Sequence, residues 1–357
     1  MLGVHPSLFH LARARTERGD ITPAIWYKLR ADRLVDADRE CVFLIRQIGA
    51  NLNELEEVTQ RRTVGWQVLF SSIRQKVDIQ APPRQQGRQA ARMFRESSGL
   101  GHGHDGIGAV LRGNLRSIGI LVVESPVPES ALEGCSFYVG SDITQRPCIF
   151  ANTHHVTWFR RNVVLAHELG HAIFDAENTG AALDFQDNDG ANDLPEERAQ
   201  AFAQELLLPP ESLRHLAQAR GVQWGTVTQV DLAQLVAASQ VELNLVLGAA
   251  VDAGLMPLGR SKDLRSSPLD SLLRELTDHA LSTKEYLRTK GSEATPLLVG
   301  NRTTTIPSRR IRLPVSYVAQ VLQACRDSVI SDSKAAELLM IDEFTFESRF
   351  GEFMRAA

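Results

Sequence analysis

The feature that most constrains this chain is a ten-residue run at 163–172, which reads VVLAHELGHA and contains the pattern H-E-x-x-H. Its apolar residues recur at helical spacing, so the run predicts a helix. His167 and His171 are four residues apart and therefore lie one above the other on the same face of that helix. Two imidazoles in this arrangement can hold one Zn²⁺ and leave positions open for water and substrate. Glu168 follows the first histidine, where a carboxylate can take a proton from the attacking water in peptide-bond hydrolysis.

A zinc ion held by two histidines needs a third protein ligand in a hydrolase of this type. A second helix, predicted after an acidic loop, offers three candidates: Glu196, Glu197 and Glu205. Spacing favours Glu196, because Gln200 lies one turn further along the same face, where its amide could orient the ligand. Glu197, Glu205 and an aspartate of the loop remain alternatives at this point.

Several polar residues near the motif are candidates for supporting roles. Asp175 lies one turn after the second histidine and could accept a hydrogen bond from its imidazole. His154 and His155 precede the motif helix and could stabilise an oxyanion, although loop histidines beside a strand end are the simpler interpretation. Arg160 and Arg161 begin the helix, and we interpret them as surface charges.

Three short runs before the motif helix, at 119–123, 135–139 and 148–152, have the composition of strands. Each is rich in β-branched or aromatic residues and is bounded by proline, glycine or aspartate. The rest of the chain reads as mainly helical. We therefore expect an α+β fold in which a small sheet packs on the H-E-x-x-H helix, flanked by mainly α-helical N- and C-terminal regions.

A polar stretch with two adjacent prolines, residues 78–87, predicts a linker after the N-terminal helices. Residues 176–194 are polar and acidic and predict a surface loop beside the site. We expect four parts of the chain: a helical region at 1–77, a metallopeptidase domain at 88–215, a helix-turn-helix-like unit at 216–256 and a helical region of unknown role at 257–357.

Composition places limits on partners and location. A chain of 357 residues with a net charge of −4 has no overall attraction to nucleic acid or to an anionic membrane. Its four cysteines are far apart and include no C-x-x-C pair, which is typical of free thiols in a reducing compartment and not of a cysteine zinc site. No apolar run of about 18 residues occurs, so we expect no membrane-spanning helix and a cytoplasmic protein.

The chain resembles the ImmA/IrrE family of metallopeptidases over about residues 88–256. The motif helix at 161–172 is similar to the zinc helix of that family. The run 196–209 is similar to the second family helix, usually written E-x-x-A-N-x-F-A-x-x-L-L-x-P, and the strands before the motif are similar as well. The resemblance implies that Glu196 is the third metal ligand. Gln200 departs from the pattern, because it stands where the family usually has asparagine.

The resemblance also implies a function. Members are zinc-dependent endopeptidases that cut helix-turn-helix repressors and so relieve repression of stress-response, mobile-element or phage genes. Residues 20–57 are similar to part of a DNA-binding helix-turn-helix fold, which would allow a DNA contact in which Lys28, Arg30 and Arg33 reach phosphates. Two alternatives remain: a DNA-binding transcription regulator that uses the peptidase fold as a sensor, and a toxin or phage-defence component.

Overall fold

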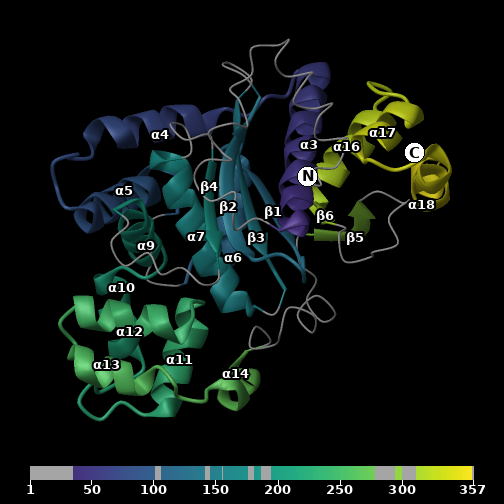
Figure 1. Ribbon diagram of the computed structural model, residues 1–357. Coiled ribbons are helices and arrows are strands. Elements are labelled where there is room, and N and C mark those ends of the chain that lie inside the picture. Colours follow the sequence, from purple (N-terminus) through teal and green to yellow (C-terminus); the bar gives the residue numbers. More distant parts are fainter. Residues whose placement is uncertain are drawn as a thin grey trace, which may run out of the picture.

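The computed structural model describes residues 35–100, 106–140, 145–154, 156–175, 181–185, 194–277, 294–299 and 311–355. The predicted phosphate contacts Lys28, Arg30 and Arg33, together with His155, lie outside these residues. Figure 1 shows a mixed α and β arrangement in which one small sheet lies between helices, so the predicted α+β class is confirmed.

The described helices before and around the motif are α3 (Asp36–Thr59), α4 (Gly65–Lys76), α5 (Pro83–Ser97), α6 (Gly108–Ser117), α7 (Trp158–Phe174) and α9 (Leu194–Leu207). They are followed by α10 (Pro210–Ala219), α11 (Gln229–Ser239), α12 (Leu243–Asp252), α13 (Leu258–Leu264) and α14 (Asp270–Leu276). The C-terminal helices are α16 (Val315–Arg326), α17 (Asp332–Leu338) and α18 (Glu343–Arg355).

The main sheet has four strands in the order β1-β3-β2-β4. Their bounds are β1 (Leu121–Ser125), β2 (Leu132–Val139), β3 (Arg146–Asn152) and β4 (Ala181–Phe185). β1 pairs with β3 in parallel, whereas β2 is antiparallel to both β3 and β4. The first three strands correspond to the three predicted runs. β4 lies within the predicted 176–194 surface loop, and that prediction is wrong for these five residues.

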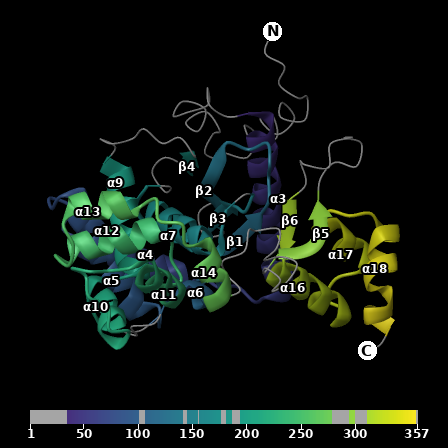
Figure 2. The same cartoon turned by 90° about the horizontal axis from the view of Figure 1, so that it is seen from below.

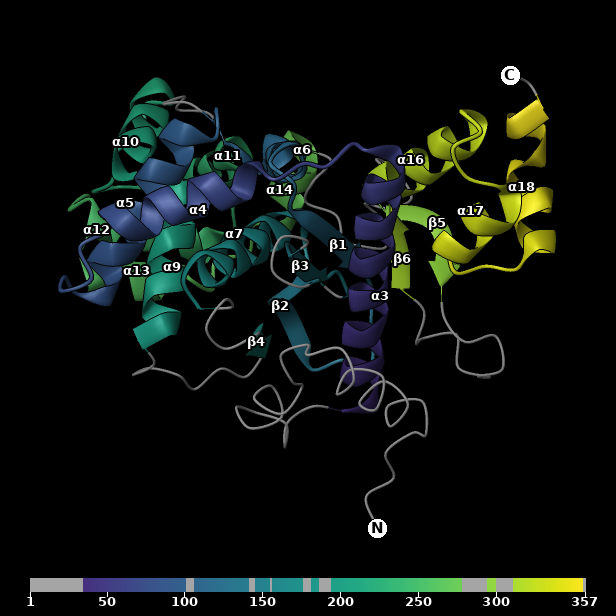
Figure 3. The same cartoon turned by 90° about the horizontal axis from the view of Figure 1, so that it is seen from above.

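The sheet separates two hydrophobic cores, because successive side chains of a strand point to opposite faces. Val122, Tyr138 and Ile149 join the core that contains α7. Their neighbours Val123 and Phe137 join the core that contains α3 and the C-terminal helices. Figure 3 shows α3 on one side of the sheet and α7 on the other. Burial on both faces explains why these strands read as continuous apolar runs.

Helix α5 begins at Pro83, so the linker predicted at 78–87 is wrong for its second half. Proline is tolerated in the first turn of a helix because the backbone N–H that it lacks has no intrahelical partner there. Gly87 lies in the second turn of α5, where a Cβ would meet the carbonyl oxygen of Arg198 in α9 at 2.2 Å. Residues 83–87 are therefore part of a helix that packs tightly against the second predicted site helix.

The N-terminal region shows one uninterrupted helix over Asp36–Thr59. Its buried face, which includes Cys41, Ile45 and Ile48, packs on the sheet and on the C-terminal helices. The part of the predicted helix-turn-helix that the structure describes thus contributes to the hydrophobic core. DNA contact through residues 20–57 stays a prediction.

Helices α11 and α12 meet at a bend of 96°, with Gln240 in the left-handed conformation at φ 58° after α11; the helix-turn-helix-like unit stays a prediction. The side chain of Gln240 accepts from Ala109 N at 2.8 Å, and its carbonyl accepts from Asn162 Nδ2 at 2.8 Å. The turn is therefore hydrogen-bonded to residues in the N-terminal halves of α6 and α7. These contacts favour a packing role for the 216–256 unit, as its acidic residues indicate.

The C-terminal region adds a two-stranded sheet, formed by β5 (Ala294–Val299) and β6 (Ile311–Pro314), to its three helices (Figure 2). It is anchored to α3 by Asn51 Nδ2, which donates to the Leu338 carbonyl at 2.9 Å, and by the ion pair of Lys334 with Glu54 at 2.6 Å. Among the described helices, none alone is long and apolar enough to span a membrane; α11 and α12 meet that criterion only together, across a bend of 96°.

Candidate metal centre

Helix α7 places the two motif histidines side by side, as their spacing predicts. Thr157 caps the helix by accepting from Arg160 N at 3.2 Å. The last turn is held by Tyr138, whose hydroxyl donates to the Ala172 carbonyl at 2.7 Å. The Nε2 atoms of His167 and His171 lie 3.0 Å apart. Both Nε2 atoms therefore point to the same place beside the helix.

Helix α9 brings Glu196, in its first turn, to that spot. Oε2 of Glu196 lies 3.1 Å from His167 Nε2, and Oε1 lies 3.5 Å from His171 Nε2. Glu205, by contrast, is at the other end of α9, where it accepts from Arg92 Nε at 2.7 Å. Among the described residues, His167, His171 and Glu196 form the group of ligand atoms close enough to hold a metal ion, and Glu197 is not part of it.

The geometry and chemistry of this group fit a zinc ion. Zinc–ligand bonds of 2.0–2.1 Å in a tetrahedral site place neighbouring ligand atoms about 3.3 Å apart. The two Nε2 atoms lie 3.0 Å apart, and each lies 3.1 or 3.5 Å from a different oxygen of Glu196, separations close to that value. Two imidazoles and one carboxylate also form the ligand set of catalytic zinc sites that keep a position open for substrate. The same set overlaps with that of non-haem iron.

Electrostatics favour a charged carboxylate at Glu196. Burial by itself would raise the pKa of Glu196, but hydrogen bonds with His167 and His171 hold it well below its ordinary range. Burial would likewise lower the pKa of His171, but hydrogen bonds with Asp175 and Glu196 and the nearby charge of Glu168 raise it to about 10. Each histidine thus faces negative charge, the environment that also stabilises a bound cation.

Glu168, the predicted catalytic residue, is fully buried at 0 % exposure. It faces strand β2, where Gly134 leaves space for it: a Cβ at Gly134 would lie 2.8 Å from Glu168 Oε1. A register shift between β2 and β4 occurs at the same point, between Leu132 and Gly134. Glycines and bulges of this kind allow a functional side chain to approach a strand closely.

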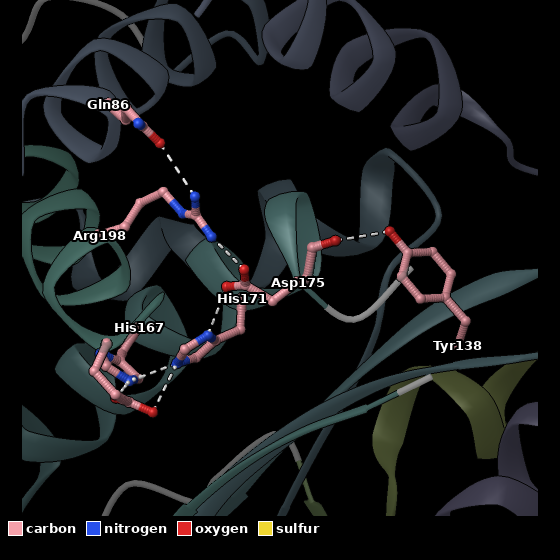
Figure 4. A network of polar contacts seen from close by, with 8 residues as sticks. Gln86, Tyr138, His167, His171, Asp175 and Arg198 are labelled. Atoms are coloured by element: carbon pink, nitrogen blue, oxygen red, sulfur yellow. Dashed lines mark hydrogen bonds and ion pairs between the residues drawn. The ribbon is translucent and has the colours of Figure 1, made fainter. Parts of the chain in front are cut away.

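Asp175 occupies the supporting position that the sequence predicts. Its Oδ2 lies 2.9 Å from His171 Nδ1. A carboxylate can only accept a hydrogen bond, so Nδ1 carries the proton and Nε2 of a neutral ring keeps its lone pair for a metal. The other oxygen of Asp175 accepts from Arg198, whose second amino group donates to Gln86 Oε1 at 3.1 Å (Figure 4).

Three predicted roles are different in the structure. The side chain of Gln200 is exposed and makes no hydrogen bond with another described residue, whereas Asp175 contacts both the His171 imidazole and Arg198. Arg160 is not a solvated surface charge, because it pairs with Glu133 and, at 2.8 Å, with Glu242.

Arg161 is also not a surface charge, since it is 0 % exposed. Its Nη1 lies 3.4 Å from Glu124 on β1, and its guanidinium lies 5.1 Å from the Trp158 ring. His154 lies outside the three-residue group described above; its backbone N–H donates to Asn152 at 3.0 Å. Sequence reasoning missed Arg198 and Gln86, whose positions give no local pattern.

The fold and the site define a metallopeptidase-type domain. Residues 115–238 match the family model Peptidase_M78, described as the IrrE N-terminal-like domain. This segment, which contains β1 to β4, α7 and α9, is therefore similar to the IrrE N-terminal-like domain, and the match confirms the resemblance to the ImmA/IrrE family. No curated protein matches the chain.

Proposed function

We propose that the chain is a zinc-dependent endopeptidase that cuts a helix-turn-helix repressor and so relieves repression in a stress, mobile-element or phage response. The observation that carries the hydrolytic part is the convergence of His167, His171 and Glu196 beside the buried carboxylate of Glu168. The repressor substrate rests on the resemblance to the ImmA/IrrE family and on the matching family model.

Each residue has a defined task in this proposal. His167, His171 and Glu196 would hold the zinc ion. When bound, zinc supplies Lewis acidity that polarises the scissile carbonyl and lowers the pKa of water. A carboxylate oxygen of Glu168 takes the proton from the attacking water and later delivers it to the leaving amine. Asp175 keeps the proton of His171 on Nδ1, so that Nε2 is available as a ligand.

Hydrolysis of a repressor is tested with the full chain and a Glu168→Gln variant, each supplied with zinc. Both are incubated with a panel of helix-turn-helix repressors and with size-matched proteins that bind no DNA, and new N-termini are identified by mass spectrometry. We expect wild type to cut at least one repressor within its chain and Glu168→Gln to be slower by about 10²–10⁴-fold.

Two results would contradict the proposal. Equal cleavage by Glu168→Gln would show that the proposed base does not act in the reaction. Cleavage of the size-matched proteins but of no repressor would contradict the proposed substrate class and leave the hydrolytic mechanism in place.

A further inference from the structure

We propose that Arg198 is a positioning residue of the metal centre, that it acts on His171 through Asp175, and that Gln86 of α5 anchors it. This inference rests on the proposed metal-dependent function. It extends the working unit of the peptidase to α5, Pro83–Ser97, which precedes the residues 115–238 matched by the family model.

A continuous chain of hydrogen bonds connects α5 with the metal ligands (Figure 4). The two oxygens of Asp175 are divided between His171 Nδ1, at 2.9 Å, and a guanidinium nitrogen of Arg198. A carboxylate that bonds through one oxygen alone could rotate about its side-chain torsions. With Arg198 on the second oxygen, the first oxygen stays directed at the imidazole, and the orientation of the ring is fixed.

Gln86 is in turn fixed in a single orientation. Its Nε2 donates to the carbonyl of Ala81 at 2.7 Å and to that of Ile79 at 3.1 Å, in the turn before α5. Both amide hydrogens are used, so Oε1 must face the other way, toward Arg198 Nη1 at 3.1 Å. The residue is buried, with 8 % of its surface exposed. Gln86 therefore gives Arg198 a rigid acceptor on a different helix.

The backbones of α5, α7 and α9 also approach one another closely near residues 198–199. A Cβ at Gly87 would lie 2.2 Å from the Arg198 carbonyl oxygen, so α5 touches the α9 backbone directly. On the other side, a Cβ at Gly170 would lie 3.1 Å from the Cα of Ala199, so α7 also approaches α9 closely. Helix α9, which carries Glu196, is thus packed closely between α5 and α7 at residues 198–199.

The guanidinium group suits this position. Its planar fork presents several donors in fixed directions, so one side chain can contact Gln86 and Asp175 together. The guanidinium carbon also lies 4.6 Å from the centre of the Phe174 ring, which limits its motion. A lysine keeps the positive charge but offers a single flexible ammonium group. Arg198→Lys therefore removes the simultaneous contact with Gln86 and Asp175 but keeps the positive charge.

The chain offers a matched control. Arg92 on α5 donates to Glu205 on α9 at 2.7 Å, so this pair also joins the two helices through an arginine. It lies at the end of α9 away from Glu196 and has no contact with Asp175 among the described residues. Arg92→Lys is the same chemical change in the same helix pair without a route to the metal ligands.

The experiment measures zinc affinity by competition with a chelator, together with the visible spectrum of the Co²⁺-loaded full chain. Wild type, Arg198→Lys, Gln86→Met and Arg92→Lys are compared, and urea unfolding shows that each variant is folded. Loss of an outer hydrogen-bond partner typically costs 10–100-fold in metal affinity. We expect about a 10-fold loss and an altered Co²⁺ spectrum for Arg198→Lys, and a smaller loss for Gln86→Met.

The outcomes separate this inference from the proposed function. Arg92→Lys should retain the affinity and the Co²⁺ spectrum of wild type. If Arg198→Lys and Gln86→Met match Arg92→Lys while wild type binds zinc, the positioning role is wrong and the metal site stands. If wild type binds neither Zn²⁺ nor Co²⁺, the metal-dependent function itself is wrong, and the inference is overturned with it.

Discussion

Gly134 on strand β2 lies directly against Glu168 on helix α7. A Cβ at position 134 would come within 2.8 Å of both Glu168 Oε1 and Val164 Cγ1. A real Cβ does not sit this close to another heavy atom, so the buried carboxylate occupies space that only glycine leaves free. The strand and the helix thereby fix the position of the proposed base relative to His167 and His171.

Gly134→Ala should lower the free energy of unfolding by about 1–3 kcal/mol, because the added methyl overpacks this contact. Urea unfolding of the metal-free protein measures the effect. Gly113→Ala is the control, since a Cβ there meets nothing closer than Arg116 Nη2 at 3.8 Å. Within α6 that substitution should stabilise the chain by about 0.5–1 kcal/mol. Equal effects of the two substitutions would show that Glu168 is not held against β2.

Glu124→Gln should destabilise the protein by about 3–5 kcal/mol, because it removes the buried partner of two arginines. Arg112 donates to both oxygens of Glu124, at 2.6 and 2.7 Å, and Arg161 lies 3.4 Å away. Denaturant titration at neutral pH measures the loss. Glu352→Gln, on the exposed face of α18, should change stability by less than about 0.5 kcal/mol.

The effect of Glu124→Gln should also depend on pH. Burial by itself would raise the pKa of Glu124, but Arg112 and Arg161 lower it below the ordinary value of 4.5. A carboxyl group whose pKa is lower in the folded state than in the unfolded state stabilises the fold at pH values above its unfolded-state pKa. That stabilisation is lost as the pH falls through the folded-state pKa. The difference from wild type should thus be full above pH 4.5 and shrink below it. A difference that grows on acidification would contradict this ion-pair assignment.

The four cysteines should be unreactive in the folded protein. All are free and buried, and burial raises the pKa of each thiol, to about 12 for Cys148. Few thiolates then form near pH 8, and the thiolate is the reactive species. A thiol reagent should label none of them on the timescale of free cysteine and all four in urea. Rapid labelling of the folded chain would contradict their burial.

The local part of the site could be predicted from the sequence. Two histidines four residues apart face the same way on any helix, and an acid that opens the next helix lies near its positive end. The spacing of His167 and His171 and the placement of Asp175 one turn later are properties of a single helix. The structure brings these residues together with Glu196, and their roles as ligands and support remain the proposal that the metal experiments test.

The remaining contacts depend on parts of the chain that are distant in sequence. Arg198 reaches Gln86, 112 residues earlier, and Arg161 is buried because Glu124 on β1 lies beside it. No local periodicity in the sequence indicates that Arg161, which follows a predicted loop, will be buried beside strand β1. The face that Gln200 shares with Glu196 predicts a place on the site, yet the packing of α9 between α5 and α7 leaves Gln200 exposed.

The fold shows the same division. The three buried strands were visible as short apolar runs, but β4 pairs with β2 through residues Ala181–Phe185, whose polar surroundings indicate a loop. Similarly, a Pro-Pro pair is typical of linkers, whereas here the second proline begins helix α5. In both cases tertiary packing overrides the local propensity of the sequence.

The most direct test of the metal centre is equilibrium zinc binding by wild type, Glu196→Ala and Glu197→Ala at neutral pH. The two glutamates are adjacent in the first turn of α9, and Glu196 alone lies within 3.5 Å of both histidine Nε2 atoms. We predict about one zinc ion per wild-type chain, kept in Glu197→Ala and lost or sharply weakened in Glu196→Ala. A wild-type chain that binds no zinc, or an affinity that falls in Glu197→Ala and not in Glu196→Ala, would contradict this account.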